Sequence, residues 1–354
     1  MAMLPIVADR AFNRQGILDD YISFIWTERY YESGDFELVV PITDKNVGLC
    51  QRGNYILRDD CIDIGIIEKL EYSTNIDNVE QMVVSGRFLT SLLGRRVISP
   101  VMVGQGYDLS QVLYLMWLYN VKNPAISARR MDMSFTPDSR IILDHTDIEV
   151  QLIGENLLQA YSDFASEYDF GFRVRRVDDQ FDLHLYDGVD RSYDQTDNPY
   201  IVFSTEYDNL SASYYQEDYS SLVTDVWVNG ETKDDGTTYA TWSSDGTAKS
   251  GIDRYEDYMQ SSSTRTPDEG TTLTEAQYLA MLQLQGRLSI RKMQQGFSGE
   301  VYFGGYEYRK DINIGDKCTL RNDRWGVHVN ARLIEMIEST NEAGEYTTVP
   351  TFGL

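Results

Sequence analysis

YISFIWTERYYESGDFELVVPIT, residues 21–43, alternates between apolar and polar side chains in both of its halves. A period of two is typical of a β-strand that buries one face. One face of the first half carries Ile22, Phe24, Trp26, Glu28 and Tyr30. One face of the second half carries Phe36, Leu38, Val40 and Ile42, and the turn lies at Ser33, Gly34 and Asp35. We therefore predict a β-hairpin, which needs a second apolar layer and so favours an antiparallel barrel or sandwich.

Length and charge limit the possible functions. The chain has 354 residues, which is long for a single core and favours two or three domains. It has 31 basic against 56 acidic residues and a net charge of −25, which argues against nucleic acid or an anionic membrane as an attractive partner. The acidity is explained most simply by solubility. The 25 tyrosines and 5 tryptophans suit a β-rich chain with large protein contacts.

The cysteines and the apolar runs bear on the cellular compartment. Cys50, Cys61 and Cys318 have no CxxC spacing, so we predict no disulfide framework and folding in a reducing compartment. The first residues lack the pattern of a signal peptide. The longest apolar run, residues 112–119, is far shorter than the roughly 20 residues of a bilayer span, so we expect no membrane span.

The fold class predicted from these patterns is α+β, mainly β. Residues 1–103 read almost wholly as β and suggest a small barrel with one helical segment. Its further strands are expected at 54–58, 61–72 and 79–85, and its helical segment at 87–93.

Residues 104–200 predict a middle α+β domain. Asp108, with Gln111 three positions later, is a good N-cap for a buried helix that runs to Tyr119. A second helix is expected at 154–168, followed by strands at 171–177 and 181–186.

The remainder returns to β after an insertion. Residues 201–228 read as β, and 229–270 as a loop-rich lobe with a hairpin at 239–242. Thr274 and Gln277 form a capping box for a third helix that runs to about residue 294. Strands are then expected at 297–303, 316–320 and from 327, with a bulge at Ile334 and a final hairpin that turns at 341–344.

No residue pattern indicates catalysis. His145, His184 and His328 form no ligand-like pair, and no HExxH, GxSxG, Walker or GxGxxG sequence occurs. The aspartate-rich segment 178–197 has Ser192 where an EF-hand loop needs glycine, so we interpret it as a solvated acidic loop. We therefore predict no catalytic residues, no cofactor and no metal, and a binding or assembly protein.

Several segments carry a resemblance. They are IWTERYYESGDFELVVP, GRFLTSLLGRRVI, GENLLQAYSDFASEYDFGFRV, FSTEYDNLSASYYQEDYSSLVTDVWVNGE and INIGDKCTLRNDRWGVHVNARLIEMIEST. In this order and spacing the chain resembles the tail-tip hub proteins of siphophages, prophages and contractile injection systems, which are related to the baseplate hub of contractile-tailed phages. The similar segments span nearly the whole chain, and none of them is a catalytic signature.

The resemblance implies two tail-tube-like β-barrels per chain, in residues 1–103 and in 201–229 with 297–354, separated by the middle domain and by an insertion at 230–296. It also implies a homotrimer whose six barrels continue a hexameric tube. The partners would be a tail tube or distal tail protein above, and a spike, fibre or plug below. DNA or a tape-measure protein would pass through the channel without specific binding. The location would be a virion tail tip or an injection-system baseplate, assembled in the bacterial cytoplasm.

Two further expectations concern particular residues. Within the hairpin we expect Trp26, Glu28, Arg29 and Tyr30 to lie at the contact between ring subunits. The alternative function is a carbohydrate-binding or glycan-hydrolysing tail protein that uses Trp227, Tyr239 and Trp242 as a sugar platform. We expect a non-enzymatic protein, because the receptor-binding or peptidoglycan-cleaving extension of some Gram-positive tail-tip proteins has no counterpart after the second β region.

Overall fold

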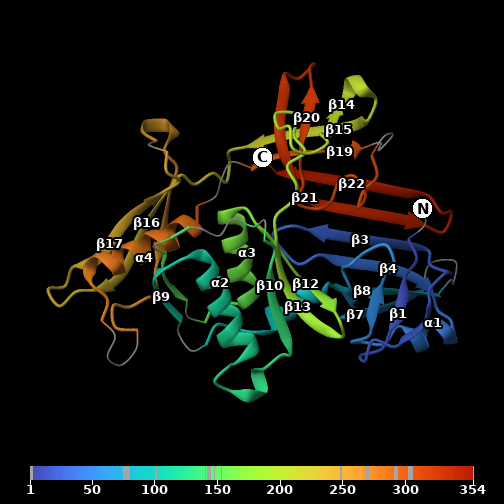
Figure 1. Ribbon diagram of the computed structural model, residues 1–354, viewed down its shortest axis with the longest axis horizontal. Helices are drawn as coiled ribbons and strands as arrows, with labels where there is room; N and C mark the ends of the chain where they lie inside the picture. Colours follow the sequence, from blue (N-terminus) through green and yellow to red (C-terminus); the bar gives the residue numbers. More distant parts are fainter. Residues whose placement is uncertain are drawn as a thin grey trace.

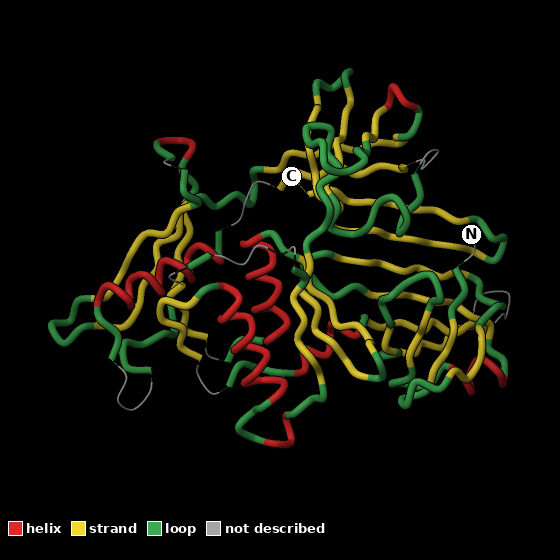
Figure 2. Tube along the Cα trace, viewed as in Figure 1, coloured by secondary structure: helices red, strands yellow, loops and turns green. Residues whose placement is uncertain are grey.

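A computed structural model shows a mixed α+β chain that is mainly β (Figures 1 and 2). It describes residues 3–74, 80–99, 102–139, 141, 145–146, 148–152, 154–247, 249–267, 272–290, 294–301 and 306–353. The predicted fold class is confirmed at this level. Among the helices of these ranges, none is both long and apolar enough to cross a bilayer.

The largest element is a ten-stranded sheet that joins both ends of the chain (Figure 1). Eight of its strands follow the spatial order β15 (Leu210–Asp218), β19 (Gln294–Val301), β22 (Tyr346–Gly353), β21 (Val327–Asn341), β3 (Ser23–Arg29), β4 (Asp35–Pro41), β8 (Glu80–Arg87) and β7 (Lys69–Thr74), each antiparallel to its neighbours. The other two are β14 (Val202–Ser204) and β20 (Lys317–Asn322), which extend it beside β21.

The predicted hairpin is confirmed as β3 and β4. Trp26 pairs with Phe36 and Phe24 with Leu38, so that the apolar faces of both strands coincide. All four side chains are buried, as the alternation predicted. The turn needs glycine at Gly34, because a Cβ there would lie 2.2 Å from the carbonyl oxygen of Thr27.

A second layer covers the hairpin and forms with it the first β unit, which comprises β1–β8. This layer is a four-stranded sheet in the order β2 (Arg14–Ile17), β1 (Ile6–Ala8), β5 (Tyr55–Leu57) and β6 (Gly65–Ile66), with the short helix α1 (Asp44–Leu49) beside it. An isolated bridge between Gly65 and Phe88 joins the two layers at one corner. The described strands form two facing sheets that do not join into a closed barrel, so residues 1–103 are mainly β as predicted, but the predicted barrel is not found as a closed one.

The strand predicted at 61–72 is wrong as a single element. The chain leaves the second layer after β6 and enters the ten-stranded sheet at β7. Alternate residues that the sequence placed on one face of one strand therefore lie in different layers. Ile62 and Tyr72 are exposed, whereas Ile64 and Ile66 are buried. The helical segment expected at 87–93 is a 3-10 helix at Leu89–Arg95, which packs into the core of the middle domain.

The second β unit comprises β14, β15 and β19–β22. Its core contains Phe203, Leu320, Leu333, Met336 and Phe352. The bulge predicted near Ile334 is confirmed by a register shift between Leu333 and Glu335. The final turn is confirmed too, since the N–H of Gly344 donates to the carbonyl oxygen of Asn341.

The two β units repeat one arrangement on either side of the contact between β3 and β21. Outward from this contact, each half of the sheet contains a hairpin, β3–β4 or β21–β22, and then two further antiparallel strands, β8–β7 or β19–β15. Because every neighbouring pair is antiparallel, the strand directions of the two halves match when they are read outward from this contact with β3 and β21 reversed.

The middle domain has the helices that the sequence predicted. α2 (Leu109–Trp117) begins at a capping box of Asp108 and Gln111, and α3 (Leu157–Tyr168) is capped by Asn156. They cover the sheet β10 (Met133–Pro137), β13 (Gln180–Tyr186) and β12 (Gly171–Val177), while β9 (Met102–Tyr107) pairs with β11 (Ile148–Leu152).

The inserted lobe is a three-stranded sheet, β17 (Thr238–Ser244), β16 (Asp225–Thr232) and β18 (Glu256–Gln260), covered on one face by α4 (Glu275–Leu288). The capping box of Thr274 and Gln277 is confirmed. The pairing of β16 differs from the expectation that residues up to 229 belong with the second β unit. β16 stays in the lobe because Val226 and Val228 pack with Tyr278 and Leu282 of α4.

We expect Trp26→Ala to lower the free energy of unfolding by about 3–5 kcal/mol, because truncating a fully buried ring leaves a cavity. The Trp26 ring lies 4.4 Å from Phe88 and 6.0 Å from Phe36, between their centroids. Urea denaturation measures the change. Trp325→Ala, at a side chain that is 47% exposed, serves as the matched control and should change stability by less than about 1 kcal/mol. Equal effects of the two variants would contradict the packing described.

Candidate functional site

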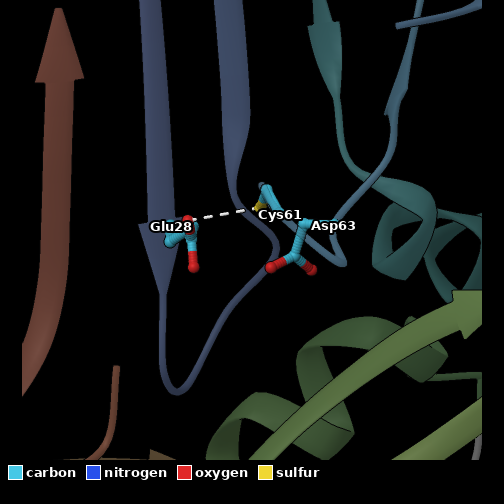
Figure 3. A group of neighbouring side chains, drawn as sticks. All are labelled: Glu28, Cys61 and Asp63. Carbon is cyan, nitrogen blue, oxygen red and sulfur yellow. Dashed lines mark hydrogen bonds between the residues drawn. The ribbon is translucent and has the colours of Figure 1, made fainter. Parts of the chain in front are cut away.

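A cluster of charged side chains lies where the two β units and the middle domain meet. Figure 3 shows three of its members, Glu28 on β3 with Cys61 and Asp63 on the loop after β5. We use the name junction cluster for Glu28, Arg58, Asp60, Cys61, Asp63, Arg173, Tyr308, Arg309 and Glu338. These residues come from three separate parts of the chain, so the cluster can form only when those parts dock.

Glu338 of β21 is the centre of the cluster and is almost fully buried. Arg58 donates to both of its carboxylate oxygens, over 2.9 and 3.2 Å. Arg309 also donates to both oxygens, and the Tyr346 hydroxyl donates over 2.6 Å. Burial raises the pKa of Glu338, but the hydrogen bonds and charges of Arg309 and Arg58 outweigh it and hold the pKa below its usual range.

Glu28 of β3 is the second buried carboxylate. Arg309 donates to its Oε1, and the hydroxyl of Tyr308 donates to its Oε2 over 3.0 Å. The thiol of Cys61 lies 3.5 Å from Oε1. Burial, together with the negative charges of Glu28 and Asp63, raises the pKa of Cys61 well above its usual value, so this sulfur stays a neutral thiol.

Asp63 joins the middle domain to the cluster. Its carboxylate accepts a hydrogen bond of 3.1 Å from Arg173 of β12. Burial raises the pKa of Asp63 to about 6; Glu28 acts in the same direction, while Arg173 and Arg309 oppose the rise. The cluster holds four carboxyl groups against three guanidinium groups, and Asp63 is the carboxyl group whose pKa is raised.

The grouping of Glu28, Cys61 and Asp63 raises the question of a metal ion, because their ligand atoms lie within 4.8 Å of one another. The charges around them do not fit a cation. Arg309 already neutralises Glu28, Arg173 neutralises Asp63, and the Cys61 sulfur is held as a thiol rather than as the thiolate that metals bind. The grouping is therefore part of an ion-pair network.

A cavity of 410 Å³ opens beside the cluster. Its walls combine the cluster residues Glu28, Arg173 and Arg309 with His184 and Tyr186 of β13. The rings of His184 and Tyr186 are stacked, and the Nδ1 of His184 lies 2.9 Å from the carbonyl oxygen of Thr136. Burial lowers the pKa of His184, which keeps this ring neutral near pH 7. The histidine thus has a structural contact within the sheet.

A second ionic contact joins the middle domain to the second β unit. Arg332 of β21 donates to Asp169 over 2.8 Å and to Asp187 over 2.9 Å, and its guanidinium lies 4.9 Å from the centre of the Tyr30 ring. Tyr30 packs so closely that a Cβ on Gly315, whose φ is +93°, would come within 2.4 Å of it. Glycine is therefore required there by both space and backbone conformation.

The residues predicted for the ring contact have other neighbours within the chain. Trp26, Glu28 and Tyr30 are buried in a single chain, and Arg29 keeps 28% of its side chain exposed while it pairs with Asp35 and Glu335. The correct inference was that Glu28 shares the apolar face of the hairpin. That face meets the same chain, so a contact of these residues with another subunit stays a prediction.

Sequence reasoning missed Arg58, Arg309 and Glu338. Glu338 had a usable signal, because it lies two residues after the buried Met336 and so shares its face of β21, as Glu28 shares the face of Trp26 on β3. A carboxylate on a buried face needs a cation, which predicts an arginine partner without naming it. The acidic segment was also predicted too simply, because Asp182 is buried and ion-paired with Arg175.

Comparison with known proteins decides the family. Residues 4–354 match the family described as Siphovirus ReqiPepy6 Gp37-like protein. The chain belongs to this family. The match to a siphovirus family agrees with the resemblance to phage tail proteins that the sequence shows. No curated protein matches the sequence of this Gp37-like chain.

Solved tail proteins share the fold of the Gp37-like chain at low sequence identity. A tail protein from Neisseria meningitidis MC58 has a TM-score of 0.59 and 12% identity, covering 100% of this chain and 97% of its own. The 43 kDa tail protein of prophage MuSo2 from Shewanella oneidensis has 0.56 and 12%, covering 99% and 98%. The prophage tail protein gp18 from Listeria monocytogenes EGD-e has 0.52 and 15%, covering 100% and 94%.

We expect Arg309→Ala to lower the free energy of unfolding by about 3–5 kcal/mol, because it leaves two buried carboxylates, Glu28 and Glu338, without their shared cation. Arg321→Ala is the matched control. It breaks the solvent-exposed ion pair with Asp323, which should leave the stability nearly unchanged. Chemical denaturation of both variants measures the difference, and an Arg309→Ala variant as stable as Arg321→Ala would contradict the role of the junction cluster.

The raised pKa of Asp63 predicts a pH dependence. Its contribution to stability is fully present below the unfolded value of 3.8 and is lost as the pH rises through about 6. Relative to Asp63→Asn, the wild-type protein should therefore lose stability between about pH 4 and pH 7 and stay level above. Urea denaturation of both proteins across this range measures the difference, and parallel curves would contradict a raised pKa.

Proposed function

We propose that the protein is the hub of a phage tail tip, in which three copies close into a ring with pseudo-six-fold symmetry. The ring joins the hexameric tail tube or distal tail protein to a spike, fibre or plug, and leaves a channel for DNA or a tape-measure protein. Its role is structural, and the virion tail tip or an injection-system baseplate is its location.

The observation that carries this proposal is the repeated arrangement on either side of the β3–β21 contact. Each chain supplies two four-stranded antiparallel halves, β3–β4–β8–β7 and β21–β22–β19–β15. Three copies therefore supply six such halves, the number needed to match a hexameric tube. In this proposal each half takes the place of one tail-tube-like barrel, and six of them complete the ring.

The two ends of the sheet suggest how copies could meet. β7 and β15 are the outermost strands, and no described strand pairs with their outer sides. Exposed edges are ready to pair with another chain, and a head-to-tail contact closes into a ring when the rotation is right. We propose that β7 of one copy meets β15 of the next.

The junction cluster supports the ring by holding the two halves at one angle. It links Glu28 of the first half to Glu338 of the second through Arg309, and Arg58 adds a second link. A ring closes only if the angle between its units is constant, so a buried ionic contact of defined geometry suits this purpose. Of the four predicted ring residues, we keep the partly exposed Arg29 as a proposed subunit contact.

The charge of the chain suits a channel for cargo. A net charge of −25 repels DNA, so cargo would pass without adhering. In this proposal part of the acidic surface lines the channel.

The backbone directions in the sheet identify a variant that tests the edge contact. The N–H of Ile42 donates to the carbonyl oxygen of Glu80, so the backbone groups of Glu80 and of every second residue after it on β8 point toward β4. The residues between them on β8, such as Val83, point their backbone groups toward β7. Val83 pairs with Glu71, so Glu71 bonds to β8 and the residues on either side of it point outward. The N–H of Tyr72 therefore points away from the sheet, and proline is tolerated at such an edge position.

We expect the wild-type protein to form a ring of three copies, seen as a trimer by native mass spectrometry and as a six-lobed particle by electron microscopy. Tyr72→Pro should weaken the trimer while the melting temperature of the monomer stays unchanged, because the variant removes only the outward N–H and the side chain. Tyr72→Ala is the matched control, since it removes the ring but keeps the N–H. A wild-type protein that stays monomeric at high concentration would contradict the proposed ring. A trimer equally stable in both variants would place the contact away from β7.

A further inference from the structure

Three aromatic side chains form one row across the sheet of the lobe. Trp227 on the central strand β16 pairs with Trp242 on β17 and with Tyr258 on β18. Residues directly opposite one another project to the same face of a sheet. We use the name aromatic row for Trp242, Trp227 and Tyr258. With strands about 4.8 Å apart, the row extends over two strand spacings.

The aromatic row lies on the face that the helix α4 does not cover. The other face carries Val226 and Val228, which pack against α4, and Ser243, whose hydroxyl donates to the carbonyl oxygen of Gln283. Trp242 is 42% exposed and Tyr258 is 57% exposed. Tyr239, which the sequence placed in a sugar platform with the two tryptophans, is buried on the covered side against Tyr278. Tyr258 takes its place in the row.

Polar contacts hold the rings in position. The guanidinium of Arg254 lies 4.6 Å from the centre of the Trp242 ring and is itself held by Asp225, over 2.6 Å, and by Glu256. The hydroxyl of Tyr258 donates to Gln260 over 2.9 Å and accepts from Asn229 over 3.3 Å. The exposed rings are therefore ordered in advance, which lowers the entropy cost of binding a ligand.

The chemistry of the hollow over the row narrows the class of ligand. The hollow has a volume of 560 Å³, and Glu256 and Asp257 line it beside the three rings. Carboxylates outnumber cations here, because Asp225 and Glu256 share Arg254 and Asp257 adds a further carboxylate. This charge disfavours nucleic acid, anionic lipid and anionic polysaccharide.

We propose that the aromatic row binds a neutral glycan chain. Sugar rings have an apolar face of C–H groups, which stacks on aromatic rings, and a rim of hydroxyl groups, which bonds to amides and carboxylates. A row of three rings in register fits consecutive sugar units of one chain better than it fits a compact ligand.

The position of the lobe is compatible with this role. The lobe lies at the opposite end of the long axis from β3 and β4 (Figure 1). A glycan could therefore bind while the ten-stranded sheet takes part in a ring. The inference goes beyond the proposed hub function and does not depend on it, because it concerns a different surface.

The test uses the full-length protein. It is screened on an array of neutral and anionic oligosaccharides, and the strongest neutral binder is titrated by tryptophan fluorescence. We expect weak binding, with a Kd of about 1 mM or below. Trp242→Ala and Tyr258→Ala should each weaken it by about tenfold or more, which corresponds to 1.4 kcal/mol. Trp242→Phe should retain part of the affinity, and Trp325→Ala, at an exposed tryptophan outside the lobe, should leave it unchanged. Melting temperatures verify that the variants are folded.

Several outcomes would overturn the proposal. These are the absence of any neutral binder on the array, a preference for anionic glycans, or an affinity that Trp242→Ala and Tyr258→Ala leave intact. Self-association of the wild-type protein that both variants abolish would show instead that a second copy covers the row. The trimer assay separates this proposal from the hub function, because variants in the aromatic row should leave the trimer intact.

Discussion

The structure depends on the compensation of two carboxylates that β-strands carry into the interior. Glu28 and Glu338 lie on opposite sides of the contact between the two β units, and each would be costly to bury alone. Arg309 reaches both carboxylates, and Arg58 forms a two-pronged contact with Glu338. Because neither unit holds all of these charges, separation of the units leaves buried charge unpaired. The network therefore favours a single relative orientation, although replacement by apolar residues could match its contribution to stability.

This constraint explains why a long β chain behaves as one framework. The antiparallel pairing of β3 with β21 makes a continuous sheet from the two ends of the sequence. The ion pairs of the junction cluster add contacts between the side chains of the two strands. The middle domain is tied to the same place twice, by Arg173 on Asp63 and by Arg332 on Asp169 and Asp187.

The lobe is attached by apolar packing rather than by ion pairs, because the helix that covers it has two apolar faces. Tyr278, Met281 and Leu282 of α4 cover the lobe sheet, while Leu284 joins the core of the middle domain. This leaves one face of the lobe sheet open, and that face carries the aromatic row. The second face of α4 also joins the lobe to the middle domain.

Local periodicity was enough to predict the hairpin at 21–43, the capping boxes at Asp108 and Thr274, the bulge near Ile334 and the mainly β composition, because each depends on neighbours along the chain. The sequence also placed Glu28, one of the two buried glutamates of the candidate site, on a buried face. Only the tertiary structure decided its partners. Alternation shows which face of a strand is buried but carries no information on the strand beside it, so the pairing of β3 with β21 was not predictable from either one. Arg309 lies outside any regular element, where no period exists to show that its side chain points inward. The split of residues 61–72 between two sheets has the same cause, since a chain can change layers without interrupting its alternation.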